Sequence, residues 1–217
     1  MDAPTRRRVG LVAAFGGYYD TRAVVTFFTT GAYRAPGGDW QAGTPNAWGK
    51  WIFARANLGR LDDARDRGLI GVIAERKLKD EDAGIADLKA GLGPQGRAVL
   101  ALLENRDPDR VPALIQDLPA GVRRDLEALS LANKDLSDLS VPAILLHGRD
   151  DPVIPPTESE ALAAALAPGT ARLFVVDNFV HVELDGLGGR DIVTLWRAVY
   201  RLLEMRDGLP RPVIGPK

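Results

Sequence analysis

Residues 141–156 read Val-Pro-Ala-Ile-Leu-Leu-His-Gly-Arg-Asp-Asp-Pro-Val-Ile-Pro-Pro, an apolar run that leads into a polar turn. Its apolar run, Ala143 to Leu146, has the length of a strand buried on both faces. His147-Gly148 closes the run, and a polar turn with two carboxylates, Asp150 and Asp151, follows at once. The sequence therefore predicts a core strand whose carboxyl end carries ionisable side chains.

The next segment predicts a helix and then a second strand. Thr157 and Glu160 match a Thr-x-x-Glu capping box, and Ala-Pro-Gly at 167–169 ends the helix. Residues 173–176, Leu-Phe-Val-Val, then predict another buried strand. A strand, a helix and a strand in this order imply parallel pairing, with functional loops at the carboxyl ends of the strands.

Two more segments complete the predicted core. Val9 to Phe15 is an apolar run that stops at Gly16-Gly17, and we expect a strand buried on both faces. A final helix presents one apolar face, made of Ile192, Leu195, Trp196, Val199 and Leu203.

The middle of the chain, from about residue 22 to 139, has helical periods broken by Gly and Pro. Asp107-Pro108 predicts a helix start, and Val122, Leu126 and Leu129 share a helical face. The predicted fold class is α/β, with about three parallel strands, flanking helices and a helical cap insertion. The expected divisions are a core of residues 1–21 and 140–207, a cap or lid of 22–139, and a loose tail of 208–217.

Composition excludes several classes of protein. Lys and Arg number 28 against 29 acidic residues, so no strong field attracts nucleic acid or an anionic membrane. No run reaches the ~20 apolar residues of a membrane span, and the basic start at Arg6 to Arg8 leads into too short a run for an export signal. The absence of cysteine excludes disulfides and thiolate sites. We expect a cytoplasmic protein without nucleic-acid or membrane partners.

The stretch His-Gly-Arg-Asp-Asp-Pro-Val-Ile-Pro, together with His181 after the next strand, resembles the α/β-hydrolase superfamily. The resemblance covers residues 141–203 well and 9–20 weakly. It implies a partial α/β-hydrolase fold in which Asp151 is the triad acid and His181 the general base. The alternative is that Asp151 only caps a turn and His181 is an ordinary loop histidine. His147 is interpreted as packing at the strand end, and Asp150 as solvated.

The nucleophile that the resemblance implies is absent. No Gly-x-Ser-x-Gly elbow precedes Asp151, and the four serines, Ser130, Ser137, Ser140 and Ser159, lack the flanking glycines. In one interpretation, residues 9–15 form the strand that follows the elbow, and the first five strands are missing. In the other, residues 12–16 are a decayed elbow with Ala14 in the serine position.

We therefore expect a truncated or split ester or acyl hydrolase that is inactive alone and would take a small-molecule ester or acyl substrate if completed. The alternatives are a non-catalytic binding module and one subunit of a two-chain hydrolase with the serine supplied in trans. With the strand order that the resemblance implies, the strand near Val9–Phe15 has lost its neighbour and presents an unpaired apolar edge, which could serve as the contact of a homo- or hetero-oligomer.

Other sequence motifs lack the neighbouring secondary structure that their function requires. We therefore expect no metal and no cofactor. Gly91 to Gly96 fits Gly-x-Gly-x-x-Gly but follows a helical stretch, so it is interpreted as a turn. The mixed charges of Asp62 to Arg67 indicate a solvated helix face. Four aromatic residues of the cap either line a substrate pocket or form its own core, namely Trp40, Trp48, Trp51 and Phe53.

Overall fold

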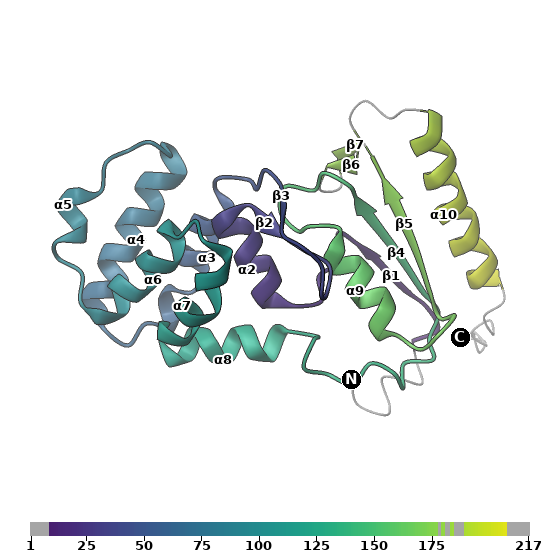
Figure 1. Ribbon diagram of the computed structural model, residues 1–217, viewed down its shortest axis with the longest axis horizontal. Coiled ribbons are helices and arrows are strands. Elements are labelled where there is room, and N and C mark those ends of the chain that lie inside the picture. The colour runs from purple at the N-terminus through teal and green to yellow at the C-terminus, as the bar shows by residue number, and fades with distance from the viewer. Residues whose placement is uncertain (1–8, 178, 181–182, 185–188, 208–217) are drawn as a thin grey trace, which may run out of the picture.

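A parallel three-stranded sheet organises the molecule (Figure 1). The computed structural model describes residues 9–177, 179–180, 183–184 and 189–207. The strands are β1 (Val12–Phe15), β4 (Ala143–Gly148) and β5 (Ala171–Val176), in the order β1-β4-β5. The register joins Val12 to Ala143 and Ala143 to Ala171. The predicted α/β class with three parallel strands and flanking helices is confirmed.

The centre and the edge of this sheet differ in burial. All six residues of β4 are buried, as the apolar run predicts. β1 is an edge strand, and Val12 and Phe15 are 39% and 55% exposed. The prediction that this strand is buried on both faces was wrong, because an apolar run does not distinguish a central strand from an edge strand.

The free edge of β1 follows from its hydrogen bonds to β4. Val12 N–H donates to Pro142 O and Gly16 N–H donates to Leu146 O, both at 2.9 Å. Peptide groups along a strand alternate in direction, so those of Ala13 and Phe15 point away from β4. Within the described part of the chain, no other strand pairs with them.

Helices α9 (Thr157–Ala165) and α10 (Gly189–Asp207) cover opposite faces of the sheet. His147 bonds to Ser159 of α9, whereas its neighbour Leu146 packs with Ala198 of α10. Successive strand residues point to opposite faces, so these two contacts place the helices on different sides. Two short strands, β6 (Phe179–Val180) and β7 (Glu183–Leu184), pair after β5.

The capping box predicted at the start of α9 is not formed. Pro156 is the N-cap, Thr157 is already the first helical residue, and no side chain bonds the first turn. Thr157 is buried rather than placed to cap the helix, so the Thr-x-x-Glu spacing was misleading here.

The expected apolar face of the last helix is not covered by the sheet. Leu195 packs against the small core of β4 and β5, but Ile192, Trp196, Val199 and Leu203 are exposed.

A block of helices, in the left half of Figure 1, lies beside the sheet and has its own hydrophobic core. Its helices are α2 (Thr21–Thr30), α3 (Gly49–Ala56), α4 (Ala64–Lys79), α5 (Ala86–Lys89), α6 (Pro94–Glu104), α7 (Val111–Asp117) and α8 (Ala120–Leu129), with 3-10 turns at Leu58–Arg60 and Pro108–Arg110. A hairpin of β2 (Ala32–Tyr33) and β3 (Gln41–Ala42) was not predicted. Asp107 caps the turn that starts at Pro108, as expected.

Two expectations inside this block need correction. Asp66 does not belong to a solvated face, because it is fully buried and accepts hydrogen bonds from Gly93 N–H at 2.5 Å and Gly96 N–H at 2.7 Å. It thereby holds the first turn of α6. Leu129 shares a sequence pattern with the buried Val122 and Leu126 but is 58% exposed at the end of α8.

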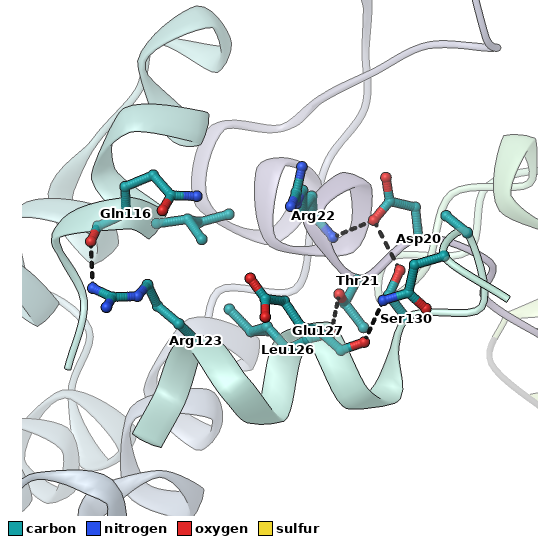
Figure 2. Close-up of a pocket in the computed structure, with 11 residues that line it drawn as sticks. Asp20, Thr21, Arg22, Gln116, Arg123, Leu126, Glu127 and Ser130 are labelled. Atoms are coloured by element: carbon teal, nitrogen blue, oxygen red, sulfur yellow. Dashed lines mark hydrogen bonds between the residues drawn. The ribbon is translucent and has the colours of Figure 1, made fainter. Parts of the chain in front are cut away.

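The points where the chain enters and leaves the block are bonded to each other (Figure 2). Thr21 Oγ1 donates to Leu126 O at 2.8 Å, and Ser130 Oγ donates to Asp20 at 3.2 Å. Tyr19 O also accepts from the amides of residues 131 and 132. A pocket of about 160 Å³ opens at this crossing, and the side chains of Asp20, Thr21 and Ser130 in its wall form these bonds.

Glu158 on α9 fixes the same crossing from the side of the sheet. Its Oε2 accepts hydrogen bonds from Tyr19 N–H at 2.9 Å and Asp20 N–H at 2.6 Å, and the residue is only 3% exposed. Burial raises the pKa of this carboxyl group, against the opposing effect of the two amide hydrogen bonds.

In the described residues, no helix is long and apolar enough to cross a membrane.

Replacing Glu158 tests this joint. Glu158→Ala leaves two amides without their acceptor and is expected to lower the free energy of unfolding by about 1–3 kcal/mol. Glu158→Gln keeps an acceptor oxygen and serves as the matched control. Urea denaturation measures both changes, and an alanine variant as stable as the glutamine variant would contradict the role of the joint.

The raised pKa also sets a pH dependence. A carboxyl group whose pKa is higher in the folded state contributes most stability below its unfolded value of 4.5, and loses that contribution as pH rises through the folded pKa. The stability of wild type relative to Glu158→Gln should therefore fall as pH rises from 4.5. A stability difference between wild type and Glu158→Gln that stays constant as pH rises from 4.5 would contradict the raised pKa of Glu158.

Candidate functional site

Asp151 lies in the loop after β4, at the carboxyl end of the central strand. Its side chain is 1% exposed. Oδ1 accepts hydrogen bonds from Val153 N–H at 2.8 Å and Ile154 N–H at 3.1 Å, which fixes the carboxylate in the turn. A buried and oriented carboxylate of this kind can position a neighbouring cation or imidazole.

The turn after β1 approaches the other oxygen of this carboxylate. Gly16 has a φ of +57°, in the left-handed region that favours glycine. A Cβ on Gly16 would lie 3.2 Å from Asp151 Oδ2. The Gly16-Gly17 signal in the sequence thus stops the strand and also lets the chain pass close to the acid.

A cavity of about 290 Å³ adjoins Asp151 and has walls from two parts of the chain. One wall is the loop after β4, from Arg149 to Pro156. The other comes from the helical block and is made of Phe27, Tyr33, Ala42, Gly43 and Thr44. Asn46 N–H donates to Pro152 O at 2.7 Å, which ties the block to the acid loop. The block therefore forms one side of the space in front of the carboxylate.

His181, the predicted general base, lies outside the described residues. Asp150, the neighbouring carboxylate, is exposed at the cavity and differs clearly from the buried Asp151. Arg149 forms an exposed ion pair with Asp177, with Nε and Oδ1 2.5 Å apart. The pKa of the Arg149 guanidinium is raised by its hydrogen bond to Asp177.

His147 is fully buried, and its ring takes part in a hydrogen-bond network that the sequence did not reveal. Nε2 lies 2.9 Å from Ile154 O, which can only accept, so this nitrogen carries a proton. Nδ1 lies 2.6 Å from Ser159 Oγ and, in the neutral ring, accepts from that hydroxyl. Asp151 Oδ2 is 3.8 Å from Nε2, beyond hydrogen-bond length.

These three side chains combine a serine, a histidine and an aspartate but do not form an accessible nucleophile. Ser159 is fully buried, and its hydroxyl also lies 3.2 Å from Gly17 O. A substrate carbonyl has no route to a sealed hydroxyl. The network instead fastens β4 to α9 and to the turn after β1.

The aromatic residues of the block divide between its core and its surface. Trp51 is buried in the core of the block, and Phe53 packs against that core. Trp48 is 44% exposed. Trp40 lines a separate cavity of about 420 Å³, where its Nε1 donates to Asp109 and the Arg34 guanidinium stacks 4.0 Å above its ring. None of these four residues lines the cavity beside Asp151.

Comparisons with known proteins establish no family. A scan against protein-family models finds no match, and a search of curated proteins finds none. Among solved structures, Rv0554 from Mycobacterium tuberculosis is similar at a TM-score of 0.28 and 18% identity, over 76% of this chain and 64% of that one. A malate-bound thermophilic esterase from Thermogutta terrifontis is similar at a TM-score of 0.24 and 17% identity, over 89% of both chains. Similarity at these TM-scores establishes neither family nor activity.

Removing the Ser159 hydroxyl tests its structural role. Ser159→Ala leaves the buried Nδ1 of His147 without the bond from this hydroxyl and is expected to cost about 1–3 kcal/mol of unfolding free energy. Ser137→Ala is the matched control, because Ser137 is exposed, and a change within about 0.5 kcal/mol is expected there. Chemical denaturation of both variants measures the difference. Equal stability of the two variants would show that the network does not hold α9.

Proposed function

We propose that Asp151 and His181 are the acid and the general base of an α/β-hydrolase-type site, and that the 217-residue chain holds no nucleophile for them. The observation that carries the proposal is the buried, oriented Asp151 carboxylate at the carboxyl end of β4, beside a cavity. A carboxylate in this position holds a histidine in the required tautomer and stabilises its charged form. The reaction class is acyl transfer to water, on an ester, thioester, lactone or amide.

The described serines support the absence of a nucleophile. Ser130 bonds to Asp20, and Ser137 bonds to Asp135. Ser159 is buried and hydrogen-bonded to His147. Ser140 lies in the segment that leads into β4, at the opposite end of that strand from Asp151. An elbow serine stands on a strained turn between a strand and a helix, and none of the four occupies such a turn.

Residues 9–15 fit the strand after an elbow better than the elbow itself. Ala14, the position that a decayed elbow assigns to serine, lies inside β1 opposite Leu145. A nucleophile has to stand on the turn that follows the strand. The first interpretation of the N-terminal segment is therefore the one that we retain.

With this function, residues 1–21 and 140–207 form the hydrolase core and residues 22–139 form the lid. Residues 208–217, which the sequence predicts to be a loose tail, lie outside the described residues. The wall that residues 27–44 contribute to the cavity beside Asp151 supports a lid role. Lids of this kind set which substrate reaches the acid and the base.

A two-chain hydrolase is the second candidate, and the open side of β1 favours it. Among the residues that the structure describes, no strand pairs with the outer edge of β1, and one face of β1 borders a cavity of about 380 Å³. Its walls are almost entirely apolar and include Val12, Ala14, Leu136, Leu139, Leu162 and Leu166. A strand followed by an apolar helix from another polypeptide would occupy both features and bring a serine next to the acid.

Hydrolysis of an activated ester tests the first candidate. We expect purified chain to hydrolyse p-nitrophenyl acetate no faster than its His181→Ala and Asp151→Asn variants, because no nucleophile is present to activate. Turnover by the chain alone that His181→Ala abolishes would contradict the proposal.

Complementation distinguishes the two candidates. The chain is co-expressed with the polypeptide encoded immediately upstream, if that frame encodes Gly-x-Ser-x-Gly. The two-chain enzyme is supported if activity requires both chains and is lost when either His181 or the motif serine of the upstream polypeptide is replaced. Stable association without activity supports a non-catalytic binding module instead.

A further inference from the structure

The outer side of α10 carries a large exposed apolar surface. Twelve large hydrophobic side chains are exposed in the described part of the chain, and six of them belong to α10, with exposed fractions between 40% and 64%. We call this surface the α10 stripe; it consists of Ile192, Val193, Trp196, Val199, Tyr200 and Leu203. The rings of Trp196 and Tyr200 stack with centroids 5.4 Å apart.

The stripe is separate from the side of α10 that contacts the sheet. Leu195 and Ala198 face β4 and β5, while the stripe lies next to them around the helix axis. Arg197 and Arg201 lie on the remaining, polar side. The apolar arc of α10 is therefore wider than the sheet covers, which is typical of a helix that packs on a second partner.

The spacing of the central residues suits a second copy of the same helix. Ile192, Trp196, Val199 and Leu203 follow at intervals of four, three and four residues, the alternation of a helix-pairing seam. This order is the same when it is read backwards. An antiparallel copy therefore meets the stripe in matching register, with Ile192 opposite Leu203 and Trp196 opposite Val199.

The area of the stripe is sufficient for a dimer. Its six side chains expose roughly 600 Å² of surface, an estimate from their exposed fractions and typical side-chain areas. A stable interface buries about 600–1,000 Å² on each partner. Two stacked aromatic rings at the centre also match the composition of interface hot spots.

We propose that the α10 stripe is the contact surface of an antiparallel homodimer of this chain. The surface is independent of the proposed hydrolase site, because no residue of α10 lines the cavity beside Asp151.

Sedimentation equilibrium over a concentration series up to about 100 μM tests the proposal. Wild type is expected to dimerise with a Kd in the micromolar range, as a small apolar interface allows. Trp196→Glu should raise that Kd at least tenfold, by placing a charge at the centre of the seam. Trp196 is 64% exposed, so its replacement leaves the core intact, and circular dichroism confirms the fold.

Val72→Glu is the matched control. Val72 is 46% exposed on α4, far from the stripe in sequence, and this variant should dimerise like wild type. A wild-type chain that stays monomeric throughout the series overturns the proposal. Dimers that persist in Trp196→Glu also overturn it, because association then uses another surface such as the edge of β1.

Discussion

The hydrogen bonds that Glu158 accepts from Tyr19 and Asp20 connect the two parts of this molecule. The acceptor lies on α9, which packs on the sheet, and the donors lie where the chain passes from β1 into the helical block. Tyr19 also accepts, through its carbonyl oxygen, from the segment that returns from the block. The cavity beside Asp151 has one wall from each part, so its shape depends on this joint.

The two buried ionisable side chains at the end of β4, His147 and Asp151, have different surroundings. His147 is enclosed by α9 and the loop after β4, and its ring nitrogens are engaged by Ser159 and Ile154. Such a ring stabilises packing and has no access to substrate. Asp151, in the loop that follows β4, is also buried but borders a cavity. A loop histidine that reached this carboxylate would be in a position to act as a base, and His181 is the candidate.

The strands could be predicted where burial follows from the chain itself. Ala143 to Leu146 is a continuous apolar run, and the structure places it at the centre of the sheet. Val9 to Phe15 is also a continuous apolar run, yet the strand that it contains, β1, lies at the edge of the sheet, because the number of neighbours of a strand is a property of the assembled fold.

The side-chain networks could not be predicted, because they join residues that are distant in the sequence. Glu158 bonds to amides about 140 positions earlier, and Asp66 bonds to amides about 30 positions later. The Thr157 and Glu160 spacing suggested a local cap, whereas the structure uses the intervening Glu158 for a long-range contact. The apolar pattern of α10 was recognised correctly, but periodicity does not reveal whether such a face meets the sheet, a partner or solvent.

We propose that Asp151 and His181 lie together, and NMR can test this proposal because the chain contains only two histidines. Proton NMR titration of the imidazole signals, assigned with a His181→Ala variant, measures the pKa of His181 in wild type and in Asp151→Asn. A neighbouring carboxylate favours the charged imidazole, so we expect the pKa of His181 to fall when Asp151 loses its charge. An unchanged pKa of His181 would mean that the two side chains do not meet, and would contradict their assignment as acid and base.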